Sequence, residues 1–430
     1  MTPQIAIIGA GWAGMAAAVQ AASDGHAVTV FESARALGGR ARGIDVQLPD
    51  GRDTRLDNGQ HILIGAYSES LRLMETVGVE PQKVLHTLPL TLKFPDGTGL
   101  QLPELPVPLD VLAGIARASA WPLAERLRLL RMALGWKLSD FTCDAELSVA
   151  QLCHGLGPRI MRELIEPLCV SAMNTPAVQA SAQVFLRVLH DALFGVRGGS
   201  RLLLPCVDLS ALFPQAARRW LREQGCGVQV GRRVNSLSAR GDRWMVDAQP
   251  FDAVVLACPS TEAARLIDAA ASGVPYAALL NNWADSARQL HYEAITTVYA
   301  WAPMTRLALP MMALRHDAAQ PAQFVFDRGQ LGGPLGLLAF VVSASRGERE
   351  VLQAQVLLQA RTQLGLDLQP VQTVVEKRAT FACTPGLRRP PTVIAPGLLA
   401  CGDYVAGPYP ATLEGAVRSG VAAARALANR

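Results

Sequence analysis

Three glycines near the N-terminus have the spacing of a dinucleotide-binding turn. Gly9, Gly11 and Gly14 form the pattern G-x-G-x-x-G directly after a short apolar run. In such a turn the first glycine allows a tight bend, the second lets the backbone approach a pyrophosphate, and the third lets a helix pack closely on a strand. Glu32 follows Gly14 by 18 residues and can accept hydrogen bonds from a ribose. These residues predict a dinucleotide site, without indicating which dinucleotide it binds.

The elements around the glycines are those that such a site needs. Ile5–Ile8 predicts a strand, Met15–Ser23 a helix of small residues, and His26–Phe31 a second strand that ends at Glu32. The helix start offers free N–H groups and the positive end of a dipole to phosphates. The alternative is a glycine-rich turn in an ordinary α/β domain, and the matching order of strand, helix, strand and acid argues against it.

Two further segments carry ligand-binding signals. Gly38-Gly39-Arg40 combines a flexible backbone with a cation that can hold a phosphate. Near the C-terminus, 397–403 predicts a strand that ends in Gly-Asp, and 411–428 predicts a helix with Thr412 at its start. Asp403 can hold sugar-like hydroxyls. One extended ligand that touches all three segments explains them together.

The composition is that of a large, apolar globular protein. The 430 residues are 50% hydrophobic and 18% charged, with a formal net charge of +4, so two or three domains are expected. No basic–aromatic pattern indicates nucleic acid. The eight cysteines form no C-x-x-C pair, which fits reduced thiols in a cytoplasmic protein, and we expect no metal site. We also expect no signal peptide and no membrane span.

Helical patterns dominate 109–194. In 109–138, leucines alternate with five basic residues, and the default interpretation is a pair of core helices with a solvated basic face. The alternative is a surface that touches anionic lipid headgroups. The helical pattern continues over 149–194, broken by prolines. The basic residues are Arg117, Arg126, Arg128, Arg131 and Lys137.

The remaining segments predict two kinds of sheet. Asp252–Pro259 is typical of a buried parallel strand, preceded by a helix over 209–224 and a strand over 228–237, with 243–251 as a hairpin partner. A mostly antiparallel sheet is predicted further on, interrupted by one helix over 350–364. Its strands are expected at 294–302, 323–327, 335–343 and 374–381.

The sequence resembles the superfamily of FAD-dependent amine oxidases and carotenoid desaturases. The resemblance rests on GAGWAG and FE within 9–32, LGGRA at 37–41, and GDY followed by PATLEGAVRSG within 402–420. It implies bound FAD, with ADP at the fingerprint, the ribityl chain at Asp403, adenine at the backbone of Val234, and the flavin at the last helix. The implied cofactor-binding residues are Gly9, Ala10, Gly11, Trp12, Ala13, Gly14, Glu32, Ser33, Gly38, Gly39, Arg40, Gln60, His61, Val234, Gly402, Asp403, Thr412 and Leu413.

The resemblance also implies the fold class, α/β with an α+β second domain. We expect a Rossmann-like FAD-binding domain built from discontinuous segments, with an inserted substrate domain of antiparallel sheet plus helices. The FAD-binding domain is predicted to take residues 1–80, 196–270 and 388–430. The substrate-binding domain is predicted to take residues 81–195, of which 109–195 are helical, and 271–387.

A narrower resemblance is to the squalene-associated enzymes, the hydroxysqualene dehydroxylases of hopanoid synthesis. It rests on DNGQHILIGAY at 57–67, EPLCV at 166–170, NTP at 174–176 and LLPCVDLS at 203–210. It implies reductive removal of a hydroxyl from an apolar C30 isoprenoid, hydroxysqualene, by hydride from reduced flavin to an allylic cation, giving squalene. The electron donor is not identified, with an NADPH-linked reductase as one candidate. Because such a substrate is nearly insoluble, we expect peripheral contact with the inner face of the cytoplasmic membrane.

The leaving hydroxyl in this reaction needs a proton donor or a polarising group. His61 is the first candidate, because the resemblance places it near the flavin, and Asp57, Tyr404 and Tyr409 follow. Each has a structural alternative. For His61 it is a hydrogen bond that shapes the flavin loop, and for Asp57 it is an Asx-type turn. The tyrosines are alternatively pocket walls, whose rings can face the cation.

Three other functions share part of the pattern. A carotenoid desaturase would run the same flavin chemistry in the opposite direction. Amine oxidases often place an aromatic residue directly before the Leu-Glu-Gly of the last helix, where this chain has Thr412, which argues against an amine substrate. Relatives that bind prenylated partners carry out no redox chemistry, and here the complete glycine set with Asp403 favours bound FAD instead.

Overall fold

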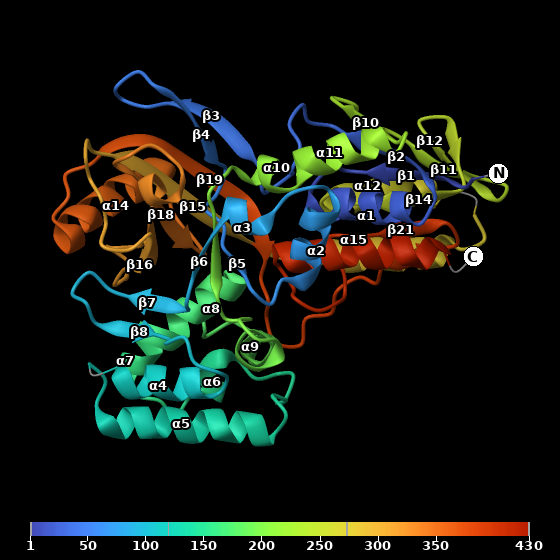
Figure 1. Ribbon diagram of the computed structural model, residues 1–430. Helices are drawn as coiled ribbons and strands as arrows, with labels where there is room; N and C mark the ends of the chain where they lie inside the picture. The colour runs from blue at the N-terminus through green and yellow to red at the C-terminus, as the bar shows by residue number, and fades with distance from the viewer. Residues whose placement is uncertain (1, 119, 272–273, 429–430) are drawn as a thin grey trace.

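The computed structural model describes residues 2–118, 120–271 and 274–428. Two β-sheets lie side by side, and a layer of helices from the cyan-to-green part of the chain extends beneath the second sheet (Figure 1). The N- and C-terminal ends lie near one another at the far end of the first sheet. The first sheet contains strands from both ends of the sequence and from its middle.

The first sheet has six strands in the order β10-β2-β1-β14-β21-β20. Every neighbouring pair is parallel except β20 with β21. All four residues of β14 are buried, which is expected where helices cover both faces of a parallel sheet. The strands are β1 (Gln4–Ile8), β2 (Ala27–Glu32), β10 (Gly227–Val230), β14 (Ala253–Leu256), β20 (Val393–Ala395) and β21 (Leu398–Ala400).

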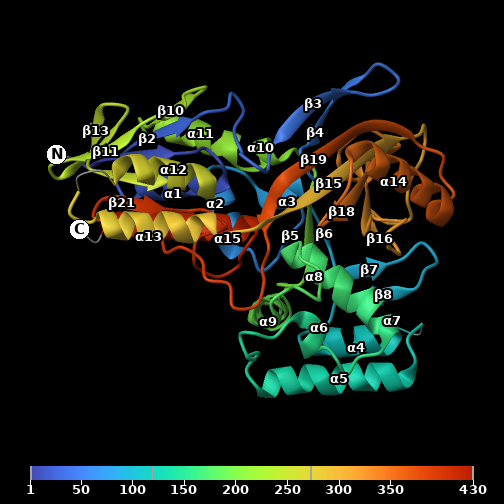
Figure 2. The ribbon, with the colours of Figure 1, turned by 180° about the vertical axis from the view of Figure 1, so that it is seen from behind.

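Alternate residues of β1 enter two different hydrophobic cores. Ile5 and Ile7 pack with helices on one face, whereas Ala6 and Ile8 join a core on the other face. The first face is covered by α1 (Trp12–Ser23), α11 (Pro214–Glu223) and α15 (Leu413–Ala428). The second is covered by α12 (Ser260–Ala270) and α13 (Ala277–Arg288), which lie in front in Figure 2. This doubly wound arrangement confirms the predicted α/β fold class.

The second sheet is antiparallel, with five strands in the order β16-β17-β18-β15-β19. One face packs on α14 (Arg349–Leu364) through residues such as Val325 and Phe340. The opposite face points into the larger core through Phe324, Phe326 and Val341. The strands are β15 (Tyr292–Trp301), β16 (Met311–Ala313), β17 (Phe324–Asp327), β18 (Leu337–Ser343) and β19 (Gln369–Phe381).

The helical layer lies beneath the second sheet in both views (Figures 1 and 2), with α5 at its outer edge. Over the described ranges, no helix is long and apolar enough to cross a membrane. Two single π-helical turns, Met161–Ile165 and Asp191–Gly195, interrupt the layer. Its helices are α4 (Leu109–Arg117), α5 (Leu123–Leu138), α6 (Val149–Leu152), α7 (Pro158–Ile160), α8 (Glu166–Met173) and α9 (Ala182–His190).

Short elements connect these layers. Three small antiparallel pairings join β3 to β4, β7 to β8, and β9 to both β5 and β6, and β11–β13 form a meander. The strands are β3 (Gly43–Gln47), β4 (Asp53–Asp57), β5 (Leu63–Ile64), β6 (Leu85–Leu88), β7 (Thr91–Lys93), β8 (Gly99–Gln101), β9 (Leu202–Pro205), β11 (Leu237–Arg240), β12 (Arg243–Val246) and β13 (Gln249–Phe251). The helices are α2 (Ser68–Thr76), α3 (Pro81–Val84) and α10 (Leu209–Leu212).

Two predicted elements are broken in the structure. The strand predicted over 228–237 ends at Val230, because Gly231 takes a φ of 68° that no strand residue adopts. The helix predicted over 209–224 is split between α10 and α11 at Phe213. Phe213 precedes a proline, and the proline ring disfavours helical backbone angles in the residue before it.

Candidate active site

A cavity of about 740 Å³ lies where the two sheets meet. It collects segments that are far apart in the sequence and brings most of the predicted site residues together. Four predicted residues do not line it, namely Ala10, Gly14, Asp57 and Tyr409. The predicted residues that line it are Gly9, Gly11, Trp12, Ala13, Glu32, Ser33, Gly38, Gly39, Arg40, Gln60, His61, Val234, Gly402, Asp403, Tyr404, Thr412 and Leu413.

The turn between β1 and α1 has room for glycine alone at two positions. Gly9 has a φ of 114°, and a Cβ there would lie 2.5 Å from the carbonyl oxygen of Ala257. A Cβ on Gly14 would lie 1.9 Å from the carbonyl oxygen of Gly9, so this glycine lets α1 approach the sheet. Gly11, by contrast, faces the cavity, with nothing closer than 3.9 Å to its hypothetical Cβ. Gly9 and Gly14 therefore have the turn and packing roles that the spacing predicts, and Gly11 leaves space on the cavity side.

The start of α1 and the end of β2 form the polar end of the cavity. No side chain caps α1, so its first amides stay open to a ligand. The two carboxylate oxygens of Glu32 accept the amides of Ala10 and Ala34, each at 2.7 Å. These bonds orient the carboxylate at the cavity wall. Ala10 therefore acts on the site through Glu32 rather than by lining it.

Arg40 and Asp403 form an ion pair across the cavity. Arg40 also donates to the carbonyl oxygen of Ala379 on β19 at 2.8 Å, so one side chain joins the glycine loop, the C-terminal segment and the second sheet. Burial works against the charged guanidinium, but the Asp403 carboxylate outweighs it and raises the pKa of Arg40. Next to Asp403, the amide of Gly402 donates to Ser419 Oγ at 2.8 Å.

His61 lies in the cavity wall with a defined tautomer. Its Nδ1 is 2.7 Å from the carbonyl oxygen of Gly59. Because a carbonyl only accepts, Nδ1 carries the proton, and Nε2 of the neutral ring is an acceptor. Burial lowers the pKa of His61, and the positive charge of Arg40 lowers it further. The ring is therefore mainly neutral at pH 7.

Asp57 does not reach the cavity. Its carboxylate accepts the amide of Leu209 at 2.7 Å, at the start of α10. Burial raises the pKa of Asp57 to about 7. The predicted Asx-type turn is wrong too, since the bond goes to a residue 152 positions away. This placement gives Asp57 a structural role and does not support a catalytic one.

The two tyrosine candidates differ in position. Tyr404 lines the cavity, but it is 1% exposed and its hydroxyl donates to the carbonyl oxygen of Cys258 at 3.2 Å. Burial raises its pKa well above the ordinary value. Tyr409 lies outside the cavity wall, with its ring 6.0 Å from that of Tyr67 and the Arg418 guanidinium 4.9 Å from its centre. Tyr67 itself lines the cavity and was missed, although it ends the 57–67 string.

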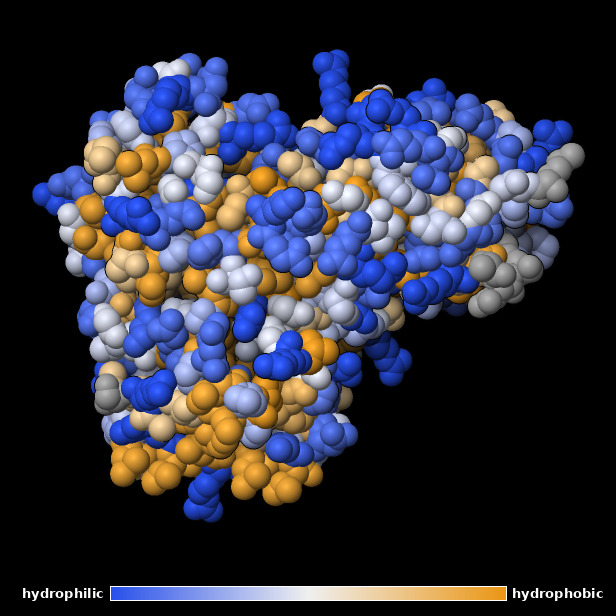
Figure 3. All heavy atoms as spheres, in the orientation of Figure 1, coloured by the Kyte–Doolittle hydropathy of each residue, from blue (hydrophilic) through white to orange (hydrophobic). Residues whose placement is uncertain are grey.

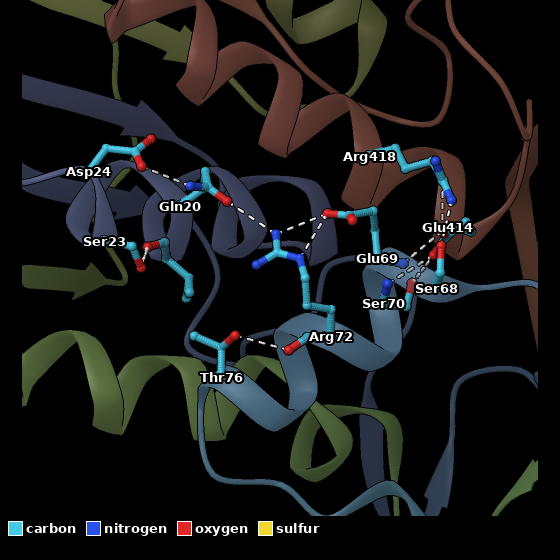
Figure 4. Close-up of polar contacts among 11 residues, drawn as sticks. Gln20, Ser23, Asp24, Ser68, Glu69, Ser70, Arg72, Thr76, Glu414 and Arg418 are labelled. Carbon is cyan, nitrogen blue, oxygen red and sulfur yellow. Dashed lines mark hydrogen bonds and ion pairs between the residues drawn. The ribbon is translucent and has the colours of Figure 1, made fainter.

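The start of α15 is fixed by a buried carboxylate that the candidate residues did not include. Thr412 Oγ1 accepts the amide of Gly415 at 3.0 Å and so caps the helix beside the cavity. Glu414 accepts the amides of Glu69 at 3.0 Å and Ser70 at 2.9 Å, and the Ser70 hydroxyl at 2.6 Å (Figure 4). Glu414 thus caps α2 and holds it against α15. Its place in the Leu-Glu-Gly string was the available sequence signal.

The end of the cavity at the antiparallel sheet is lined mainly by apolar side chains, with Glu376 of β19 beside them. Alternate residues of the antiparallel sheet face it, namely Ile295, Phe324, Phe326 and Val341, and Val170 of α8 joins them. The two-residue period of a strand explains why Phe324 and Phe326 face the cavity while Val325 packs on α14. The sequence indicated an apolar second domain without identifying these residues, although the alternation along 323–327 was the available signal.

Three features of the cavity fit groups of FAD. An uncapped helix start and an open glycine suit a pyrophosphate, and the carboxylate at the end of β2 suits a ribose. A second helix start at Thr412 and Leu413 faces the same cavity. The fold and the site are those of an FAD-dependent oxidoreductase.

The chain belongs to the family of flavin containing amine oxidoreductases, whose model matches residues 12–428. It is 29% identical to a hydroxysqualene dehydroxylase of Rhodopseudomonas palustris over 99% of this chain and 98% of the relative. It is 35% identical to a zeta-carotene desaturase of Arabidopsis thaliana over 22% of this chain and 16% of the relative. A solved oxidoreductase of Methanosarcina mazei has the same fold, with a TM-score of 0.72 and 14% identity over 99% of this chain and all of that one. These findings confirm the predicted family, the cofactor FAD and the oxidoreductase class.

Proposed function

We propose that this oxidoreductase removes the hydroxyl group of hydroxysqualene and releases squalene. The observation that carries the proposal is that one cavity combines polar groups that fit FAD with an apolar sheet face for the substrate, where Ile295, Phe324, Phe326 and Val341 lie beside Glu376. The nearly full-length similarity to a hydroxysqualene dehydroxylase supports it. Bound reduced FAD supplies the hydride, and the hydroxyl leaves as water after taking up one proton.

The apolar wall would hold the isoprenoid chain and exclude water. Phe324, Phe326 and Val341 present rings and a branched side chain to the cavity from a rigid sheet. Holding the reacting carbon in one place removes much of the entropic barrier. The aromatic faces also suit a carbon that gains positive charge as the hydroxyl departs. We therefore expect Phe324, Phe326 and Val341 to act mainly in binding the isoprenoid chain.

His61 remains the first candidate for the residue that donates a proton to the leaving hydroxyl. In its neutral form, Nε2 accepts the hydrogen of the substrate hydroxyl and orients it. In its protonated form, Nε2 donates, and the lowered pKa makes the imidazolium a stronger acid. The rate should therefore rise as the pH falls toward the lowered pKa of His61.

An anaerobic turnover assay tests the proposal. The FAD-loaded protein, chemically reduced, is mixed with hydroxysqualene in detergent, and the extract is analysed for squalene by gas chromatography and mass spectrometry. Squalene formed in proportion to enzyme supports the proposal. No squalene, together with desaturation of zeta-carotene in the presence of an electron acceptor, would favour the desaturase alternative.

A pair of variants at one position tests whether the apolar end binds substrate. Val341→Trp fills the space beside the sheet and should abolish turnover while the flavin absorbance stays. Val341→Ile adds one methylene and should leave most of the activity. Equal activity in the two variants would exclude the apolar end as the substrate site.

A further inference from the structure

The outward face of α5 is lined by leucine. Leu123, Leu127, Leu134 and Leu138 are 64%, 53%, 57% and 80% exposed. At about 100° per residue, these four side chains fall within an arc of about 60° on the helix. The opposite side of the same helix carries Trp136 and Leu129, which are buried in the core. The helix is thus apolar on both sides, and one side has no protein against it in the described chain.

The exposed charges on α5 itself have one sign, and the exposed Asp140 follows the end of the helix. Arg128, Arg131 and Lys137 are exposed, whereas the single acid of α5, Glu125, is half-buried. The prediction of a solvated basic face is therefore only partly right. In the structure, leucines occupy the centre of the exposed face of α5 and the cations flank them. Long cationic side chains at the rim of an apolar face reach outward to anionic headgroups while the leucines enter the apolar layer.

The position of α5 in the fold leaves the leucine face accessible. α5 forms the lower edge of the molecule in Figures 1 and 2, and Figure 3 shows hydrophobic atoms gathered along that edge. The segment before and within α4 adds further exposed apolar residues. These are Leu105, Val107, Leu109 and Leu112. The same helical layer contains α8, whose Val170 lines the apolar end of the cavity.

We propose that the leucine face of α5 docks on the surface of a membrane that contains anionic lipids. A second copy of this chain is the less suitable occupant, because pairing two such faces would bring the cations of one copy against those of the other with no exposed acid on α5 between them. A bilayer offers an apolar partner and an anionic partner together, since the leucines can enter its acyl chains and the cations can bind its phosphates. The proposal concerns the surface and holds whichever isoprenoid the cavity binds.

Vesicle flotation of the FAD-loaded protein tests this surface. We expect the protein to float with vesicles of about one-third phosphatidylglycerol, and less with pure phosphatidylcholine or at high salt. Arg128→Gln with Arg131→Gln should weaken binding to anionic vesicles by roughly 10- to 30-fold, at about 1 kcal/mol per cation. Leu127→Ser with Leu134→Ser should weaken binding to every vesicle composition by about tenfold or more.

Leu358→Ser is the matched control, because Leu358 is 61% exposed on α14, away from the leucine face. It should float like the wild type, and every variant should keep its flavin absorbance, which shows that it is folded. Wild type that stays in the aqueous fraction, or a Leu358→Ser effect equal to that of the α5 pair, overturns the proposal. A wild-type dimer that dissociates in the Leu127→Ser, Leu134→Ser variant would assign the face to a second copy instead.

Discussion

Glu414→Ala should destabilise the protein and loosen its hold on FAD. The carboxylate is fully buried and accepts two amides and a hydroxyl from the start of α2, and Arg418 Nε donates to it at 2.7 Å. Alanine would remove the acceptor of all four donors at once. Because α15 begins at the cavity, a loss of the contact between α2 and α15 changes the cofactor wall as well as the core.

The loss of stability in Glu414→Ala depends on which of the four donors water can reach once the carboxylate is gone. An unpaired buried donor costs about 1–3 kcal/mol, and removing one partner of a buried ion pair costs about 3–5 kcal/mol. The Arg418 side chain is 30% exposed, so water can replace its partner. The donors of Glu69 and Ser70 carry most of the loss, which we place at about 3–4 kcal/mol. With an unfolding entropy of about 2 cal/mol/K per residue, Tm should fall by about 4 °C.

The assay is thermal unfolding of the FAD-loaded variant, with flavin absorbance measured after gel filtration. Glu414→Gln keeps one acceptor oxygen and should lose about half as much. Glu69→Ala is the control, because its carboxylate forms only a partly exposed pair with Arg72 at 2.9 Å, worth about 0–1 kcal/mol (Figure 4). If Glu414→Ala unfolds within about 1 °C of Glu69→Ala and keeps its flavin, the assigned role of Glu414 is wrong.

Three further predictions concern the cavity and the residues behind it. Burial raises the pKa of Asp57 to about 7 from 3.8, so the folded wild type keeps a proton that the unfolded chain releases. The free energy of unfolding of the wild type should therefore fall by up to about 4 kcal/mol as pH rises from about 4 to 7, and Asp57→Asn should flatten this dependence. Chemical denaturation at pH 5 and pH 8 measures this, and an unchanged slope contradicts it. His61→Gln should remove the fall in kcat/KM that the wild type shows as pH rises through the lowered pKa of His61; a variant with the same pH profile would exclude His61 as the acid. Asp403→Ala should leave Arg40 without its carboxylate partner and raise the Kd for FAD by roughly ten- to a hundredfold. Titration of the apoprotein with unchanged affinity would remove Asp403 from the site.

The local parts of the site could be predicted from the sequence because each depends on neighbouring residues. Short patterns set the turn at Gly9, Gly11 and Gly14, the strand ending at Glu32, and the helix that begins directly after Thr412. The partner of Asp57 could not be predicted, because Leu209 comes next to it only after the chain has folded. The same holds for Glu414, whose acceptor role depends on amides 344 and 345 positions away.

The leucine face of α5 shows a different limit of sequence patterns. Leu127 and Leu129 are the same residue type two positions apart, and periodicity alone does not say which of them is buried. A helix with apolar residues on both sides fits a buried helix, a membrane surface or an interface equally well. Only the neighbours of α5 in three dimensions assign Leu129 to the core and Leu127 to the outside.

The fold does not decide the chemistry, so the reaction must be argued from the residues that face the cavity. Thr412 illustrates this. Its hydroxyl accepts the amide of Gly415 and donates to the carbonyl oxygen of Tyr409 at 2.7 Å, which fixes the first turn of α15 beside the cavity. An aromatic residue there would have no hydroxyl on its Cβ to make either bond, so this chain uses the position to shape a helix start rather than to build one wall of an amine cage. Phe324, Phe326 and Val341 line the same cavity as Thr412 and suit an extended hydrocarbon, whereas Glu376 is the acid on the sheet that a cation would have to reach.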